Sequence, residues 1–210
     1  MTTFLGTIRH GTTDTPALIV NEKYQVISSI VPGELFATST EVIGRWPEFA
    51  DKFNDAIDDS HNWPSLNRGD LGRPINPSTV LCAGSNYRAH NAEKKSSPTS
   101  GKEPEFFIKT GDCVIGPNDQ IIHDPMLTEK LDCETELAVV IGKPGRHIAV
   151  KNALDHVFGY TVANDVTARD RQVRTNEQGF TWYELGRGKA FDTSLPLGPW
   201  ISTPGTIADP

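Results

Sequence analysis

The segment DCETELAVVIGK, residues 132–143, constrains the fold of this 210-residue chain more than any other stretch. Its apolar run AVVI is rich in β-branched residues and ends at Gly142, which predicts a buried strand. Side chains of a strand alternate between its two faces, so Glu134 and Glu136 point the same way. Two neighbouring carboxylates leading into an apolar run are costly to bury unless a positive charge lies between them. The pattern therefore predicts a cation site on this strand.

A third carboxylate belongs to the same predicted site. Asp165 follows a second strand-like run, residues 160–163, in the segment GYTVANDVTARD. We expect Glu134, Glu136 and Asp165 to hold one hard divalent cation, with the rest of the chain built around it.

The charge balance argues against two classes of partner. The net charge is −7, and Lys and Arg are scattered, whereas phosphate contacts need them clustered on one face. No apolar stretch approaches the roughly 20 residues that span a bilayer, and the N-terminus lacks an apolar signal core. We therefore expect neither nucleic acid nor a membrane as partner.

The cysteines indicate the compartment. Cys82, Cys113 and Cys133 are odd in number and form no CxxC pattern, which predicts reduced thiols. We expect an intracellular, cytoplasmic protein, with the mitochondrion as the alternative.

The first part of the chain predicts a small α+β domain. Residues 4–31 contain three short strand patterns separated by turn-like segments, and we expect the third strand to run to Val31. A helix pattern follows over residues 41–58, with Ser39 or Thr40 as its N-cap and a break or kink caused by Pro47. Residues 61–78 form a Pro- and Gly-rich linker. We place a domain boundary near residue 70, which gives domains 1–70 and 71–210.

The second part predicts a β-rich core. Residues 80–82, 106–108 and 113–115 form short apolar runs between turn residues, and residues 150–157 form a short helix. Residues 170–189 are polar and contain glycines, which makes this segment a candidate lid. The fold class is α+β, mostly β.

A histidine and a carboxylate lie on a helix predicted to begin near Tyr87. His90 and Glu93 are three residues apart and share one side of a turn. A carboxylate beside an imidazole can orient it and raise its basicity, so the pair is a candidate general base. The alternative is a surface histidine next to a glutamate.

An ordered series of motifs resembles the fumarylacetoacetate hydrolase family, in particular its members that hydrolyse or decarboxylate acylpyruvates and 2-oxo acids. The motifs are CAGSNYRAHNAE, PEFFIKTGD, DCETELAVVIGK, GYTVANDVTARDRQ and GKAFDTSLPLGPW. They cover roughly residues 78–210 in the family's order, whereas the first 70 residues resemble only its variable N-terminal domain.

The resemblance implies a mixed β-roll core, usually dimeric, with a small-molecule substrate. It implies Mg²⁺ or Mn²⁺ at Glu134, Glu136 and Asp165, and an all-oxygen ligand set also admits Ca²⁺. The remaining site residues follow from matching positions. The implied catalytic residues are His90, Glu93 and Lys189, and the implied substrate-binding residues are Tyr87, Lys109 and Gln172.

The implied chemistry is that of β-diketo and 2-oxo acids. Such an acid can chelate a divalent cation through its carboxylate and keto oxygens, which stabilises an enolate. The leading hypothesis is metal-dependent hydrolysis of a C–C bond in acylpyruvate-like acids, with water activated by His90 and Glu93. The alternative is decarboxylation or isomerisation of oxaloacetate-like 2-oxo acids.

The chain ends earlier than family members normally do. We therefore expect a β-roll that lacks its C-terminal strands, as a fragment, a natural truncation or a degenerate paralogue. A catalytically inactive family member is the third hypothesis, although suitable side chains fill all the implied site positions.

Overall fold

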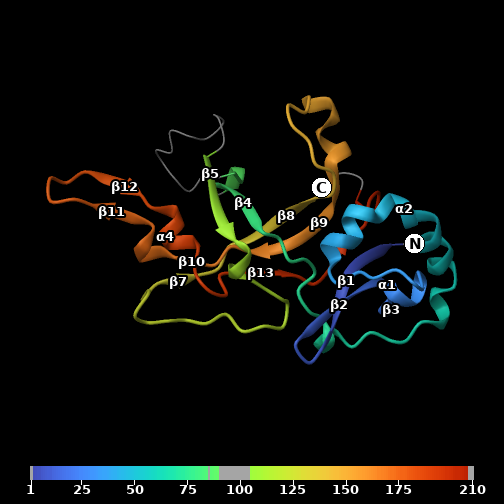
Figure 1. Cartoon of the computed structure of the whole chain (residues 1–210). Coiled ribbons are helices and arrows are strands. Elements are labelled where there is room, and N and C mark those ends of the chain that lie inside the picture. The colour runs from blue at the N-terminus through green and yellow to red at the C-terminus, as the bar shows by residue number, and fades with distance from the viewer. Residues whose placement is uncertain (1, 85, 90–104, 208–210) are drawn as a thin grey trace.

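The computed structural model describes residues 2–84, 86–89 and 105–207 (Figure 1). The fold is mostly β with few helices, as the sequence predicts. His90, Glu93 and residues 94–104 lie outside the described residues. In the described part, no helix combines the length and the apolar character needed to cross a membrane.

The N-terminal sheet is antiparallel and has the strand order β14-β1-β2-β3. Its strands are β1 (Thr3–His10), β2 (Thr13–Val20), β3 (Lys23–Val26) and β14 (Ile201–Ser202). The predicted extension of the third strand to Val31 is wrong, because residues 27–30 form the short helix α1 (Ile27–Ile30). Val26 pairs with Ala17, so the next residue would face Pro16, which has no N–H for the ladder.

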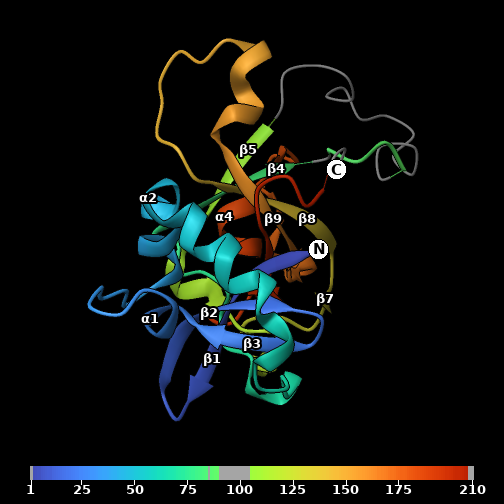
Figure 2. The ribbon, with the colours of Figure 1, turned by 90° about the vertical axis from the view of Figure 1, so that its right-hand side faces the viewer.

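Helix α2 (Ser39–Asp58) packs against this sheet (Figure 2). It begins two residues before the predicted helix pattern of residues 41–58. Its N-cap is Thr38, whose hydroxyl accepts a hydrogen bond from Glu41 N, while the Glu41 carboxylate accepts one from Ala37 N. Pro47 does not break the helix. Trp46 packs against two other aromatic rings of the core, and this burial outweighs the lost backbone hydrogen bond.

The second sheet is mixed and has the order β6-β13-β9-β8. Strands β13 and β6 are parallel, and the other two pairs are antiparallel. The strands are β6 (Val114–Ile115), β8 (Thr135–Ile141), β9 (Val157–Asn164) and β13 (Leu195–Gly198). The strands β4 (Thr79–Gly84) and β5 (Glu105–Thr110) pair with each other, and Val80 of β4 packs against the apolar cluster formed by residues of β6, β9 and β13.

Short elements complete the chain. Two-stranded ladders join β7 (Leu131–Asp132) to β10 (Thr167–Ala168) and β11 (Val173–Thr175) to β12 (Thr181–Tyr183), and α4 (Leu185–Lys189) follows. The 3₁₀ turns are η1 (Ser60–Asn62), η2 (Arg68–Asp70), η3 (Gly111–Cys113), η4 (Val150–His156) and η5 (Arg169–Arg171). The helix expected at residues 150–157 is thus the 3₁₀ turn η4.

The two parts of the chain share their core. Strand β14 comes from the C-terminal part but pairs with β1, and Phe4 faces Ser202 in the register. The largest apolar cluster contains Leu5 and Phe53 from the first part and Val140 and Phe158 from the second. The domain boundary near residue 70 stays a prediction.

An ionic cluster also crosses from the first part to the second. Arg9 on β1 forms hydrogen bonds with Asp14 and with Asp119 in the loop after β6. The Asp119 carboxylate also accepts a 2.7 Å hydrogen bond from Gly116 N. The hydrogen bond from Arg9 holds the pKa of Asp119 below its usual value.

We expect this cluster to make folding stability depend on pH in the acid range. Because the folded-state pKa of Asp119 lies below its unfolded value of 3.8, its contribution is complete above that value and is lost as the pH falls further. Asp119→Asn should lower the free energy of unfolding at pH 7 by about 1 kcal/mol and have little effect near pH 2. Thermal denaturation at both pH values measures this. The control is Asp112→Asn at an exposed position, and an equal loss for Asp119→Asn at both pH values would contradict the prediction.

Candidate active site

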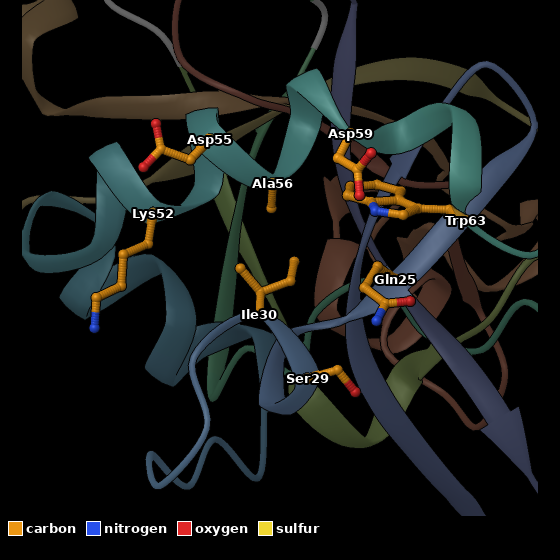
Figure 3. A pocket seen from close by; sticks show the side chains of 8 residues that line it. All are labelled: Gln25, Ser29, Ile30, Lys52, Asp55, Ala56, Asp59 and Trp63. Carbon is orange, nitrogen blue, oxygen red and sulfur yellow. The ribbon is translucent and has the colours of Figure 1, made fainter.

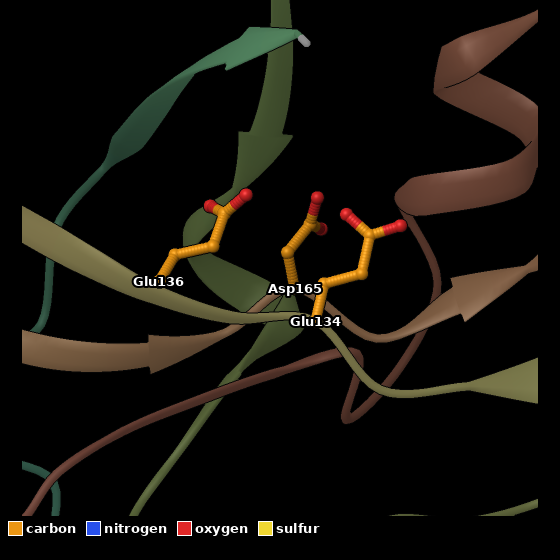
Figure 4. Close-up of side chains that lie close together, drawn as sticks. All are labelled: Glu134, Glu136 and Asp165. Atoms are coloured by element: carbon orange, nitrogen blue, oxygen red, sulfur yellow. The ribbon is translucent and has the colours of Figure 1, made fainter. Parts of the chain in front are cut away.

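The pairing of β8 with β9 brings three carboxylates together. Glu136 lies on β8 opposite Ala163, and Asp165 directly follows β9. Asp165 N donates a 2.8 Å hydrogen bond to Glu134 O, which aligns the ends of the two segments. One carboxylate oxygen from each of Glu134, Glu136 and Asp165 lies within 4.8 Å of the others, and the three side chains point to one side (Figure 4). The trio predicted from the sequence is therefore one cluster.

Lys189, at the end of α4, lies against this cluster. Its Nζ atom is 2.9 Å from Glu134 Oε2 and 2.5 Å from Asp165 Oδ2. Its side chain is almost completely buried. The predicted catalytic lysine thus contacts two of the three predicted metal ligands.

Lys109 approaches from the opposite side of Asp165. It lies on β5, and its Nζ atom is 2.9 Å from Asp165 Oδ1. The two carboxylate oxygens of Asp165 therefore each face one lysine. This arrangement neutralises part of the charge of a carboxylate that is only 1% exposed.

Arg169 and Thr167 contact the cluster although the sequence analysis did not select them. Arg169 Nη2 lies 2.6 Å from Glu134 Oε1, and its Nε atom lies 2.9 Å from Asp132 Oδ2. The Thr167 hydroxyl donates a 3.2 Å hydrogen bond to the same Glu134 oxygen. Thr167 lies on β10 and Arg169 begins η5, two and four residues after Asp165, and this spacing of two was the available signal.

The two glutamates differ in their electrostatic environment. Burial opposes ionisation of Glu134, but the hydrogen bond from Lys189 holds its pKa below the usual value. Glu136 forms no ion pair within the described part of the chain. Burial, helped by the negative charge of Asp165, raises the pKa of Glu136 to about 7. Glu136 is thus the carboxylate with the least compensation.

The cluster fits a hard divalent cation. Its donors are three carboxylate groups, the ligand type that Mg²⁺ and Mn²⁺ prefer. Glu136 lacks a cationic partner among the described residues, and Asp165 Oδ1 is buried without a well-aligned hydrogen bond despite the nearby Lys109. A cation among these oxygens would relieve both features.

Two predicted substrate-binding residues lie at the border of the cluster. The Tyr87 hydroxyl accepts a 2.8 Å hydrogen bond from Leu137 N, next to Glu136 on β8. Gln172 lies at the end of η5, where its Oε1 atom accepts a 3.3 Å hydrogen bond from Arg169. A Cβ atom at Gly188 would lie only 2.6 Å from the Gln172 side chain, so this glycine permits close packing of α4.

The candidate lid contains the β11–β12 hairpin. The hairpin projects from the body of the molecule, on the side opposite the N-terminal sheet (Figure 1). Phe180, Trp182 and Tyr183 are exposed on it. Its role as a lid stays a prediction.

The three cysteines are free, as the sequence predicts, and burial raises the pKa of the Cys82 thiol to about 12.

One surface pocket lies away from the cluster, in the N-terminal part (Figure 3). It has a volume of about 410 Å³. The elements β3, α1 and α2 and the residues on either side of η1 supply its lining residues, which are Gln25, Ser29, Ile30, Lys52, Asp55, Ala56, Asp59 and Trp63. None of the predicted site residues lines it, so the carboxylate cluster is the candidate active site.

Comparisons with known proteins relate this geometry to other sequences. The family model described as fumarylacetoacetate (FAA) hydrolase C-terminal matches residues 79–210. The human mitochondrial oxaloacetate tautomerase FAHD2A is 45% identical over 134 residues, which are 64% of this chain and 40% of that protein. The oxaloacetate tautomerase YisK of Bacillus subtilis is 38% identical over 187 residues, which are 88% of this chain and 58% of that protein. The chain thus spans about half the length of these relatives.

Solved structures share the fold. A fumarylacetoacetate hydrolase from Exiguobacterium antarcticum superposes with a TM-score of 0.72 at 31% identity, covering 96% of this chain and 66% of that one. A maleylpyruvate hydrolase from Sphingobium sp. SYK-6, solved with manganese(II) and pyruvate, superposes with a TM-score of 0.73 and covers 100% of this chain and 70% of that one. Its identity is 23%, so this second likeness concerns the fold alone.

Proposed function

This chain belongs to the fumarylacetoacetate hydrolase family, whose model matches more than half of it, and we propose that it is a metal-dependent isomerase of oxaloacetate-like 2-oxo acids. The observation that carries the proposal is the cluster of Glu134, Glu136 and Asp165 against the Lys189 ammonium. The similarity to two proteins named oxaloacetate tautomerases supports this choice of substrate class. It replaces C–C bond hydrolysis, the leading hypothesis from the sequence, as the first candidate.

The carboxylate trio would hold Mg²⁺ or Mn²⁺, with Ca²⁺ as a further candidate. When bound, such an ion supplies a Lewis acid for the carboxylate and keto oxygens of a 2-oxo acid. Lys109 would orient the Asp165 carboxylate as a ligand, and Arg169 would do the same for Glu134.

In the keto-to-enol direction a proton leaves the carbon beside the keto group and the keto oxygen takes one up, and the enol-to-keto direction reverses both transfers. The Lys189 ammonium, fixed beside the trio, would stabilise negative charge on the keto oxygen as that proton leaves. A ring nitrogen of His90, oriented by Glu93, is the candidate acceptor of the carbon-bound proton. This role comes from the family resemblance, because both residues lie outside the described part.

The proposal predicts metal-dependent conversion of enol-oxaloacetate to the keto form. The ultraviolet absorbance of the enol follows the reaction with Mn²⁺, with Mg²⁺ and with EDTA, and product analysis tests for CO₂. We expect acceleration with either ion, none with EDTA, and no stoichiometric CO₂. Release of CO₂ with pyruvate would instead identify a decarboxylase. Binding of Mn²⁺ without any turnover would favour a catalytically inactive family member.

Hydrolysis of acylpyruvate-like β-diketo acids is the second candidate. The likeness to the Exiguobacterium hydrolase at 31% identity and the His90–Glu93 pair favour it. Acetylpyruvate is the test substrate, since its hydrolysis yields acetate and pyruvate. His90→Asn should keep Mn²⁺ affinity and lose this hydrolysis if the pair activates water, and unchanged turnover would exclude His90 as the base.

We also propose a homodimer. The outer faces of β8–β9 and β4–β5 are apolar and exposed, with Val139, Ile141, Phe106 and Ile108 between 50% and 62% exposed. Burial of such a face by a second copy removes apolar surface from water. Light scattering after size exclusion should give twice the chain mass, and Val139→Glu should shift it towards the monomer. A monomeric wild-type chain would exclude this arrangement.

The location proposed is intracellular, either cytoplasmic or mitochondrial. Free cysteines support a reducing compartment, and the human relative is named a mitochondrial protein. Fractionation of the source cells would decide between the two, and recovery only in a secreted fraction would exclude both.

A further inference from the structure

The role of Lys109 is a separate question from that of Lys189, because Lys109 is completely buried. Its exposed fraction is 0%, although it carries a charge on a long side chain. Burial lowers the pKa of its ammonium, and the charge of Asp165 opposes this effect. A buried ammonium group is retained only where the surrounding acceptors compensate its lost hydration.

The acceptors around Lys109 account for all its N–H groups. The Nζ atom lies 2.9 Å from Asp165 Oδ1, 2.7 Å from Ser194 O, 3.1 Å from Ser194 Oγ and 3.3 Å from Val166 O. An ammonium group has three N–H donors, and the hydrogen bonds to Ser194 and Val166 use all three, while Asp165 Oδ1 contacts Nζ as an ion-pair partner. Lys109 therefore has neither an accessible surface nor a spare donor for a substrate.

Ser194 connects the two lysines of the cluster. Its hydroxyl accepts hydrogen bonds from Lys109 Nζ and from Phe191 N and donates a 2.8 Å hydrogen bond to Lys189 O. Its carbonyl accepts from Lys109 and from Val166 N, the residue next to Asp165. The hydroxyl thus uses its single donor and both acceptor positions within the protein, on Lys109, Phe191 and Lys189.

We infer that Lys109 is a positioning residue which, together with Ser194, fixes the Asp165 carboxylate for metal binding and does not bind substrate. This inference deepens the proposed function and rests on its metal site. It revises the substrate-binding role that the family resemblance implied for Lys109. It also assigns Ser194, which the sequence analysis did not select, to the support of the site. Partners of this kind affect metal affinity by about 10- to 100-fold.

Two variants test the inference by calorimetric titration with Mn²⁺. Lys109→Met should weaken Mn²⁺ binding by about 10- to 100-fold, and Ser194→Ala by about 10-fold, since the carbonyl of residue 194 still accepts from Lys109. At saturating Mn²⁺ the KM for oxaloacetate should stay within about 2-fold of the wild type. Ser194→Ala keeps the test valid if Lys109→Met does not fold, because it leaves the buried ion pair in place.

The matched control is Ser202→Ala. Ser202, on β14 of the N-terminal sheet, is also buried, and its hydroxyl accepts a 2.8 Å hydrogen bond from Tyr160 N on β9. This variant should lower the melting temperature and leave Mn²⁺ affinity unchanged. The inference is overturned if Ser194→Ala behaves like the control, or if Lys109→Met raises KM with unchanged Mn²⁺ affinity. Weakened Mn²⁺ binding in both variants of a chain without turnover would uphold the inference and reject the proposed reaction.

Discussion

Glu136→Gln should abolish both metal binding and metal-dependent turnover. The substitution keeps the size of the side chain and removes the carboxylate that has no cationic partner among the described residues. Lys189 and Arg169 already compensate Glu134, whereas Glu136 has no such partner among the described residues and would supply charge to a bound cation. We expect the affinity for Mn²⁺ to fall by about 100-fold or more and turnover of oxaloacetate to be lost with it.

Calorimetric titration with Mn²⁺ and the enol absorbance assay measure the two effects separately. Glu129→Gln is the matched control, because it removes one carboxylate at an exposed position outside the cluster. It should leave both quantities unchanged. Removal of a repulsive buried charge should also leave the metal-free Glu136→Gln chain at least as thermally stable as the wild type. Wild-type Mn²⁺ affinity in Glu136→Gln would reject the assignment of the trio as metal ligands.

Lys189→Met should separate turnover from metal binding. The ammonium contributes positive charge beside Glu134 and Asp165, so its removal makes the cluster more negative and Mn²⁺ affinity should not fall. Turnover should nevertheless drop by about 10²- to 10³-fold, since a preorganised positive group beside the developing oxyanion is lost. This is the opposite of the result expected for Lys109→Met, which should weaken Mn²⁺ binding.

Saturating Mn²⁺ during the assay removes any contribution of affinity to this comparison. Arg187→Met provides the control on the same helix, because it removes a positive charge that pairs with Glu184 rather than with the trio. It should retain turnover within a few-fold. If Lys189→Met binds Mn²⁺ much more weakly, Lys189 supports the ligands as Lys109 does, and its proposed catalytic role is wrong.

The strands could be predicted from the sequence because their signals are local. The alternation and apolar runs located β1, β2, β4, β5, β8 and β9 to within a few residues. The strand extension to Val31 and the break at Pro47 were wrong because both depend on neighbours in space, while a kink at Pro47 stays a prediction. The strand expected to reach Val31 ends where its partner offers Pro16, and α2 continues through Pro47 because Trp46 is packed in the core. The mixed β fold and the family are confirmed.

The sequence by itself determined which carboxylates meet. The period of two in β8 places Glu134 and Glu136 on one side, and the motif order adds Asp165 and Lys189. Only the tertiary structure decided what surrounds them. Ser194 reaches Lys109 across 85 positions of the chain, and Arg169 reaches Glu134 through the pairing of β10 with β7. A local pattern gives the direction of a side chain, whereas its burial and partners depend on which distant segments pack together.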